Sequence, residues 1–113
     1  MSKTKEVQMI QLHIDDLDYL YQSYMKFVIG GGIYFFSNED FSLGEQVFLV
    51  LSIKIDFIDK KYPMRTEVIW KNSHLSDKGY GVSFGSDEVA KIAKKDIETL
   101  LGNMDSNKKA FTM

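Results

Sequence analysis

The segment "KFVIGGGIYFFS" places three consecutive glycines, Gly30, Gly31 and Gly32, between an apolar run and a stretch rich in β-forming residues. Consecutive glycines expose backbone N–H groups that can wrap around an anion such as a phosphate. They also let the chain enter a strand with an unusual φ angle. No Gly-Lys-Ser/Thr sequence follows the triplet, and the next segment resembles a strand rather than a helix, so the usual nucleotide-binding motifs are absent. The surroundings favour a backbone role.

The chain offers few other residues that could carry chemistry. It contains two histidines and no cysteine, which excludes disulfides, a thiolate nucleophile and Cys-based metal sites. His13 alternates with apolar neighbours and is expected to face solvent from a strand, whereas His74 lies near Asp77 in the polar segment "KNSHLSDK", where such pairs are more often surface groups than metal ligands. No spacing links Ser, His and Asp into a triad. We therefore expect no catalytic residues, no metal and no cofactor, and a small enzyme is a remote alternative.

Composition describes an ordinary small globular protein. The 113 residues are 44% hydrophobic and 27% charged, which suits a single domain. The balance of 14 basic and 16 acidic residues gives no general attraction to nucleic acid or anionic membranes. The N-terminal "MSKTKEVQ" lacks the apolar core of a signal peptide, and no apolar run is long enough to span a bilayer. We expect a cytoplasmic protein that binds no nucleic acid and does not insert into membranes.

The hydrophobic pattern predicts a mainly β organisation with one helix near each end. Alternation predicts strands at "VQMIQLHI" and "MRTEVIWK", and short segments between polar turns predict further strands at "GIYFFS", "QVFLVLSIKI" and "GYGVSFG". The nearly unbroken apolar start of "QVFLVLSIKI" suggests burial on both sides. The segment "DDLDYLYQSYM" changes to helical spacing, with Asp15 or Asp16 as its cap, and "DFIDKKYP" is predicted to be a loop. Short strands joined by polar turns favour a sandwich or barrel.

The last predicted element is an amphipathic helix from about Ser86 to Leu101. Its apolar stripe comprises Val89, Ile92, Ala93, Ile97, Leu100 and Leu101. Gly102 stands where a left-handed helix cap is expected. We therefore predict a single domain over residues 1–102 and a flexible C-terminal tail over 103–113.

The order of the predicted segments carries more information than any one of them. A glycine pair comes directly before an apolar strand. The next segments are, in order, a turn with "LGE", a long strand, a strand ending in "VIWK", the segment "GYGVSF" and an amphipathic helix. This order resembles the PilZ domain family over nearly the whole chain. The segments "YQSYMKFVIGGGIYF" and "FTM" resemble, more narrowly, the free-standing members of type IV pilus assembly. The resemblance implies a PilZ-type β-barrel of about six strands, with a short N-terminal helix and a C-terminal amphipathic helix.

Many PilZ domains bind cyclic di-GMP through an Arg-x-x-x-Arg segment and an Asp/Asn-x-Ser-x-x-Gly turn. The guanidinium fork suits phosphates and guanine edges, and lysine replaces it poorly. Aligning the last glycine of the turn with Gly32 places Phe27 at the Asp/Asn position and Ile29 at the Ser position, and the only arginine is Arg65. The turn keeps Gly31 and Gly32 but loses its polar side chains. We expect no cyclic di-GMP binding; the alternative is a direct receptor that uses an unconventional site.

Aromatic side chains are the better functional candidates. Tyr and Trp often anchor protein interfaces, and we select Tyr21, Tyr24, Trp70 and Phe111 as candidate partner-binding residues, although each alone could simply pack in the core. The resemblance implies a non-enzymatic adaptor in type IV pilus assembly and twitching motility. Its implied partners are the pilus extension ATPase and a regulator with degenerate GGDEF and EAL domains, which senses cyclic di-GMP in place of the adaptor.

Overall fold

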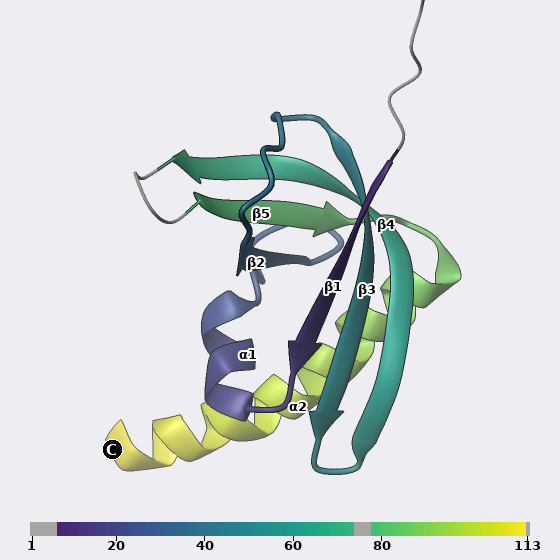
Figure 1. The fold of residues 1–113 in the computed structure, drawn as a ribbon. Helices are drawn as coiled ribbons and strands as arrows, with labels where there is room; N and C mark the ends of the chain where they lie inside the picture. Colours follow the sequence, from purple (N-terminus) through teal and green to yellow (C-terminus); the bar gives the residue numbers. More distant parts are fainter. Residues whose placement is uncertain (1–6, 74–77, 113) are drawn as a thin grey trace, which may run out of the picture.

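The computed structural model describes residues 7–73 and 78–112, with side chains for 7–72 and 78–102. Its elements are β1 (Gln8–Ile14), α1 (Leu17–Ser23), β2 (Gly32–Phe36), β3 (Gln46–Ile55), β4 (Ile58–Ser73), β5 (Lys78–Phe84) and α2 (Glu88–Thr112). The strands form one curled sheet in the order β1-β3-β4-β5-β2, and α2 crosses its concave side (Figure 1). The fold is therefore mainly β, a half-barrel with two helices; the described part has five strands where about six were expected.

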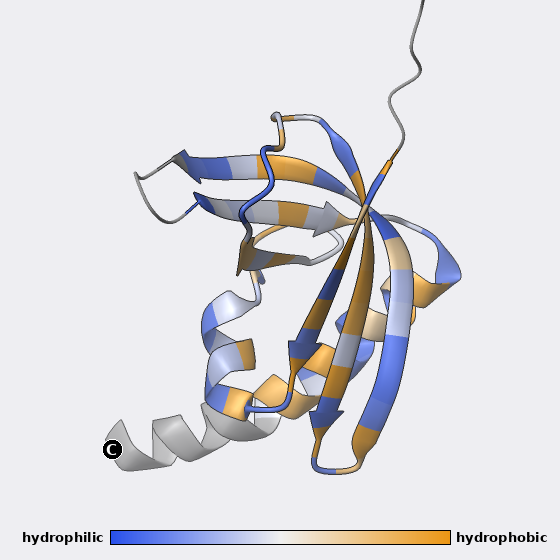
Figure 2. Cartoon of the chain, in the orientation of Figure 1, coloured by the Kyte–Doolittle hydropathy of each residue, from blue (hydrophilic) through white to orange (hydrophobic). Residues whose placement is uncertain are grey.

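Residues alternate along the strands between the core and the outer face. β1 runs parallel to β3, from the pair Gln8 and Val47 to the pair Ile14 and Ile53. Figure 2 shows the resulting alternation of hydrophobic and hydrophilic residues along these strands. The inward residues include Ile14, Ile33, Phe35, Val47, Leu49, Leu51, Ile53, Tyr62, Met64, Val68, Tyr80 and Val82. A two-residue period with one buried face fixes the register of each strand.

The central hairpin of β3 and β4 corrects the prediction of a loop over "DFIDKKYP". Only Asp56 and Phe57 form the turn, because Ile55 already pairs with Ile58. Asp56 has φ 54°, a left-handed conformation that Asp tolerates better than most residues. Pro63 lies within β4, but β5 pairs only with the part of β4 that begins at Thr66. The missing N–H of Pro63 therefore faces a side of β4 with no paired strand.

A β-bulge divides β4. The register with β5 shifts between Val68 and Trp70. Two consecutive side chains, Ile69 and Trp70, consequently remain 41% and 45% exposed, whereas Val68 is buried. A bulge of this kind re-aims side chains next to it.

α1 begins at the predicted cap and ends just before the glycine turn. The Asp16 carboxylate accepts a hydrogen bond from the Tyr19 N–H at 3.1 Å, which selects Asp16 over Asp15 as the N-cap. Leu20 is fully buried against the sheet. Tyr24 forms the C-cap and makes an isolated β-bridge with Ile33, so the chain passes directly from α1 towards β2.

α2 differs from the predicted helix in two respects. Ile92 is 42% exposed rather than part of the buried stripe, which consists of Ala90, Ala93, Ile97, Leu100 and Leu101. The helix also continues through Gly102 to Thr112, so the end predicted at Leu101 is wrong. A glycine inside a helix costs only about 1 kcal/mol relative to alanine and does not by itself stop it. The flexibility of residues 103–113 remains a prediction.

Two tyrosine–carboxylate hydrogen bonds hold α2 on the barrel. The Tyr24 hydroxyl donates to Glu98 at 2.8 Å, and the Tyr62 hydroxyl donates to Asp96 at 2.7 Å. Lys60 adds an ion pair to Asp96 at 3.3 Å. Burial, and then the hydrogen bond to Asp96, raises the pKa of Tyr62 above its usual range. These contacts fix α2 between β4 and the end of α1.

Candidate functional site: an exposed aromatic surface

The glycine triplet forms a tight turn between α1 and β2. Gly30 and Gly31 have φ angles of 83° and 90°. The Gly31 N–H donates to the Val28 carbonyl at 2.8 Å, and the Gly31 carbonyl accepts from the Phe84 N–H at 2.9 Å. The Gly31 N–H is therefore already bonded within the chain. This geometry supports the predicted backbone role over a phosphate cradle.

Gly31 and Gly32 are also required by close packing. A Cβ atom on Gly31 would lie 3.0 Å from the Tyr24 hydroxyl and 3.1 Å from the Phe84 ring. A Cβ atom on Gly32 would lie 2.7 Å from the Val82 carbonyl oxygen. Gly32 has no positive φ, so only the lack of space for a Cβ atom requires glycine there. At Gly31, both the positive φ and the lack of space require glycine.

The turn presents apolar side chains to solvent. Phe27 is 80% exposed and Ile29 is 97% exposed. These are the two positions at which the family motif requires polar residues, so neither side chain can donate a hydrogen bond to a nucleotide. Exposing a large apolar side chain to water is unfavourable, so the free energy falls when a partner covers it.

Three aromatic rings continue this apolar region over the outer face of β2 and β4. The Tyr34 and Phe36 rings meet edge to face, with centroids 5.2 Å apart, and the Tyr34 and Trp70 rings lie 5.3 Å apart. Both distances fall in the range in which aromatic pairs attract. Phe36 and Trp70 are 62% and 45% exposed. The rings thus form one row that remains open to solvent.

Two glycines of β5 make room for this row. Tyr34 pairs with Gly81, and Phe36 pairs with Gly79. A Cβ atom on Gly79 would collide with the Tyr34 hydroxyl, and one on Gly81 would lie 2.9 Å from the Met25 sulfur. Cross-strand aromatic rings can cover such glycines. We call Met25, Phe27, Tyr34, Phe36, Ile69 and Trp70 the aromatic surface.

Two hollows meet at Phe27. The first has a volume of about 420 Å³ and is lined by Met25, Phe27, Tyr34, Ile69 and Trp70. The second has a volume of about 370 Å³ and is lined by Tyr21, Tyr24, Lys26, Phe27, Glu98, Leu101 and Gly102. The first is mainly apolar and has no charged residue in its lining, whereas the second carries a lysine and a glutamate. The pair could hold two apolar anchors of one partner, one on each side of Phe27.

The carboxylate of the second hollow, Glu98, is already paired within the chain. Burial, and then the hydrogen bond to Glu98, raises the pKa of Tyr24 above its usual range. The pKa of Glu98 is lowered: burial opposes the shift, but hydrogen bonds from Tyr24 and Lys94 outweigh it. Glu98 therefore stays ionised at neutral pH and accepts both bonds, which leaves it poorly suited to act as a general acid or base.

The structure separates the four predicted partner-binding residues. Trp70 lies in the aromatic surface. Tyr21 and Tyr24 both line the second hollow. Tyr21 is half-buried against the core, and Tyr24 is buried, at 8% exposure, with its hydroxyl donating to Glu98. Phe111 lies in α2, and its side chain is outside the described part. Their role in partner binding remains a prediction.

Sequence reasoning missed Met25, Tyr34, Phe36 and Ile69. The usable signal was the spacing of Tyr34 and Phe36 at alternate positions, matched by Gly79 and Gly81 at alternate positions. That match becomes visible only when β2 is paired with β5, and the two segments are far apart in sequence.

The remaining candidates give no alternative site. His13 is exposed and lies 3.8 Å from the Asp15 carboxylate, while His74 and Asp77 fall outside the described residues. Over residues 7–73 and 78–112, no group of three or more His, Cys, Asp or Glu residues could hold a metal ion. Within the same residues, no helix is both long and apolar enough to cross a bilayer.

Comparison with known proteins agrees with this architecture. None of the curated proteins matches the sequence. The family model described as PilZ domain matches residues 8–102, which begin at β1 and end within α2. The match covers the whole curled sheet, the glycine turn and the helix packed on the sheet. Because it spans well over half of the chain, the protein belongs to the PilZ domain family.

Proposed function

We propose that this protein is a non-enzymatic, cytoplasmic adaptor of type IV pilus assembly that binds other proteins through the aromatic surface and does not bind cyclic di-GMP. PilZ domains are generally non-catalytic binding domains, and membership of the family implies an adaptor or receptor role related to cyclic di-GMP. The role in pilus assembly rests on the narrower resemblance of "YQSYMKFVIGGGIYF" and "FTM" to pilus-assembly members.

One observation carries the choice of an adaptor over a receptor. The ligand turn presents Phe27 and Ile29 to solvent at 80% and 97% exposure. A nucleotide with two phosphates needs hydrogen-bond donors and positive charge at this position. Two exposed apolar side chains offer neither, but they suit the desolvated centre of a protein interface.

The neighbouring residues extend that surface. The tilted rings of Trp70 and Tyr34 line the same hollow as Phe27, and Tyr and Trp are among the side chains that most often dominate binding energy at interfaces. Lys26 and Lys71 are exposed next to members of the surface in sequence and supply a polar rim. By resemblance, the proposed partners are the pilus extension ATPase and the GGDEF/EAL-domain regulator.

The first experiment tests the ligand. Isothermal titration calorimetry of the full chain with cyclic di-GMP should give no saturable heat at micromolar concentrations, a limit that corresponds to about −8 kcal/mol. Saturable binding with a simple stoichiometry would instead favour a receptor with an unconventional site.

The second experiment tests the surface. Pull-downs with the extension ATPase and with the regulator should weaken for Phe27→Ser and Trp70→Ala, by about 1 kcal/mol or more if these residues are anchors. Phe57→Ser is the matched control, because Phe57 is 71% exposed but lies at the tip of the β3–β4 hairpin. Equal binding by all three variants would place the partner on another face of the domain.

A further inference from the structure

A third hollow lies on the outer face of β1, β3 and β4. It has a volume of about 420 Å³ and is lined by Val7, Met9, Gln46, Val47, Phe48 and Arg65. Met9 pairs with Phe48, and Phe48 pairs with Arg65, so these three side chains form one row across the sheet. Val7 and Met9 are 55% and 58% exposed. The hollow therefore has an apolar floor open to solvent.

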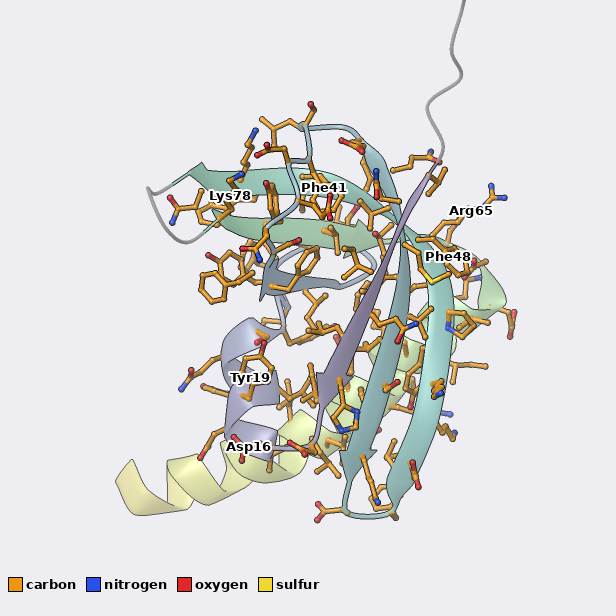
Figure 3. The ribbon with its side chains drawn as sticks, in the orientation of Figure 1. Asp16, Tyr19, Phe41, Phe48, Arg65 and Lys78 are labelled. Atoms are coloured by element: carbon orange, nitrogen blue, oxygen red, sulfur yellow. The ribbon has the colours of Figure 1, made fainter. Side chains whose placement is uncertain are left out.

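Arg65 is the one charged residue of this lining, and its side chain is exposed. It is the only arginine of the chain. Figure 3 shows its guanidinium group directed away from the sheet, with Phe48 nearby. No hydrogen bond or ion pair to this group comes from the described residues, Glu67 on the same face included.

Several lysines provide a contrast. The ammonium groups of Lys60, Lys78 and Lys94 lie 3.3, 2.7 and 3.1 Å from the carboxylates of Asp96, Asp40 and Glu98. The planar guanidinium fork of Arg65 binds a carboxylate through two parallel hydrogen bonds better than any lysine can. The described part of the chain thus leaves its best carboxylate-binding group unused, beside an apolar hollow.

We propose that this hollow docks an acidic segment of a partner protein, with an apolar side chain on Met9 and Phe48 and a neighbouring carboxylate on Arg65. A single cation suits one carboxylate, whereas nucleic acids and anionic membranes are bound by several cations together. This hollow and the hollow of the aromatic surface have no lining residue in common, so the two sites are distinct. The inference does not depend on the proposed function.

The test uses a random linear peptide library displayed on phage and selected against the full-length protein. We expect enriched peptides to carry Asp or Glu within a few residues of a large apolar side chain. Their affinity, measured with the synthetic peptides, should fall about tenfold or more in Arg65→Gln, and less in Arg65→Lys, which keeps the charge but loses the fork.

Lys61→Gln is the matched control. Lys61 is exposed on the same strand and the same face as Arg65, four residues earlier, and the substitution also removes one positive charge. Binding should change less than about twofold, as expected for a charge outside the contact. Phe48→Ala should weaken binding through the apolar floor, and circular dichroism melts check that every variant is folded.

Four results would overturn the proposal. The selection could return no peptide, or peptides without an acid, or peptides whose binding survives Arg65→Gln and is lost in Trp70→Ala. The last result would mean that only the aromatic surface docks peptides. Equal losses in Arg65→Gln and Lys61→Gln would show a general charge effect without a site.

Discussion

Two groups of glycines serve opposite purposes in this domain. In the turn, a Cβ atom would collide with groups that hold the fold together: on Gly32 it would meet the Val82 carbonyl, and on Gly31 it would meet the buried Tyr24 and Phe84. In β5, a Cβ atom would collide with side chains of the outer face: on Gly79 it would meet Tyr34, and on Gly81 it would meet Met25. The first group builds the fold, and the second group shapes a surface.

The difference teaches how to interpret a glycine-rich segment. A Cβ that clashes with backbone must move the backbone, whereas one that clashes with the end of a flexible side chain can displace it. Substitutions in the turn should therefore cost stability, and substitutions in β5 should cost mainly binding.

The largest effect is expected for Gly32→Ala. The new Cβ would lie 2.7 Å from the Val82 carbonyl oxygen, inside the β2–β5 ladder, so unfolding free energy should fall on the order of 2–3 kcal/mol. Gly102→Ala is the control, since a Cβ there meets nothing within 4 Å and the helix gains a better helix former. Urea denaturation measures both; similar midpoints for the two variants would contradict the steric argument.

The next effect separates backbone conformation from packing. Gly31 and Gly44 have similar φ angles, 90° and 86°, but a Cβ on Gly44 meets nothing within 4 Å. Gly44→Ala should therefore cost about 1 kcal/mol from its positive φ alone, and Gly31→Ala clearly more. Thermal melts compare the two; an equal loss would mean that the contacts with Tyr24 and Phe84 contribute nothing.

A smaller change in stability, with a larger change in binding, is expected for Gly79→Ala. The new methyl group displaces the Tyr34 ring, which lies on the outer face, so we expect a loss of about 1 kcal/mol. Partner capture through the aromatic surface should weaken at the same time.

The Gly79→Ala effect can be checked by a double-mutant cycle. Removing the ring with Tyr34→Ala should relieve the clash, so the loss in the double variant should be less than the sum of the two single losses. Strict additivity would show that Gly79 does not act through Tyr34.

The smallest effect concerns Glu98, which accepts the hydrogen bond from the Tyr24 hydroxyl beside Gly31. Its pKa is lowered in the folded state, so its ionised form stabilises the fold above the ordinary value of 4.5, and this contribution is lost as the pH falls through the lowered pKa. Melting temperatures of the wild type and Glu98→Gln should therefore differ at pH 7 and converge as the pH falls through the lowered pKa of Glu98. A constant difference would exclude this linkage.

The sequence predicts the parts of the fold that depend on local patterns. The apolar run "QVFLVLSIKI" matches the bounds of β3, but the burial on both sides that it suggests is wrong, because only one face of β3 is fully buried. The acidic pair before α1 includes its actual cap, Asp16. The beginning of β4 was missed because Lys60, Lys61 and Pro63 make this segment look like a loop. These residues are tolerated in a strand because the segment pairs with β3 on one side only. Gly102 failed as a stop signal because a left-handed cap is a preference, and no contact there forces it.

The candidate site was predictable only in part. Phe27 and Ile29 could be identified because a known motif places polar residues at their positions. Trp70 was identified because the alternating pattern places it at a strand end; that reason is wrong, since β4 continues to Ser73. The rest of the aromatic surface depends on which strands are neighbours. Ile69 and Trp70 are both exposed because of the bulge, and a bulge results from pairing with another strand, which no local pattern contains.

The order of the strands has a consequence for how the domain folds. β3 and β4 are joined by a two-residue turn, but Gly32 of β2 must find Ser83 of β5, and Gln8 of β1 must find Val47. Contacts between distant residues form late because closing a long loop costs entropy before any contact repays it. We expect the β3–β4 hairpin to form early and the two edge strands to join last. The row of Tyr34, Phe36 and Trp70 is completed only at that final step, so a partner that binds it selects chains that have finished folding.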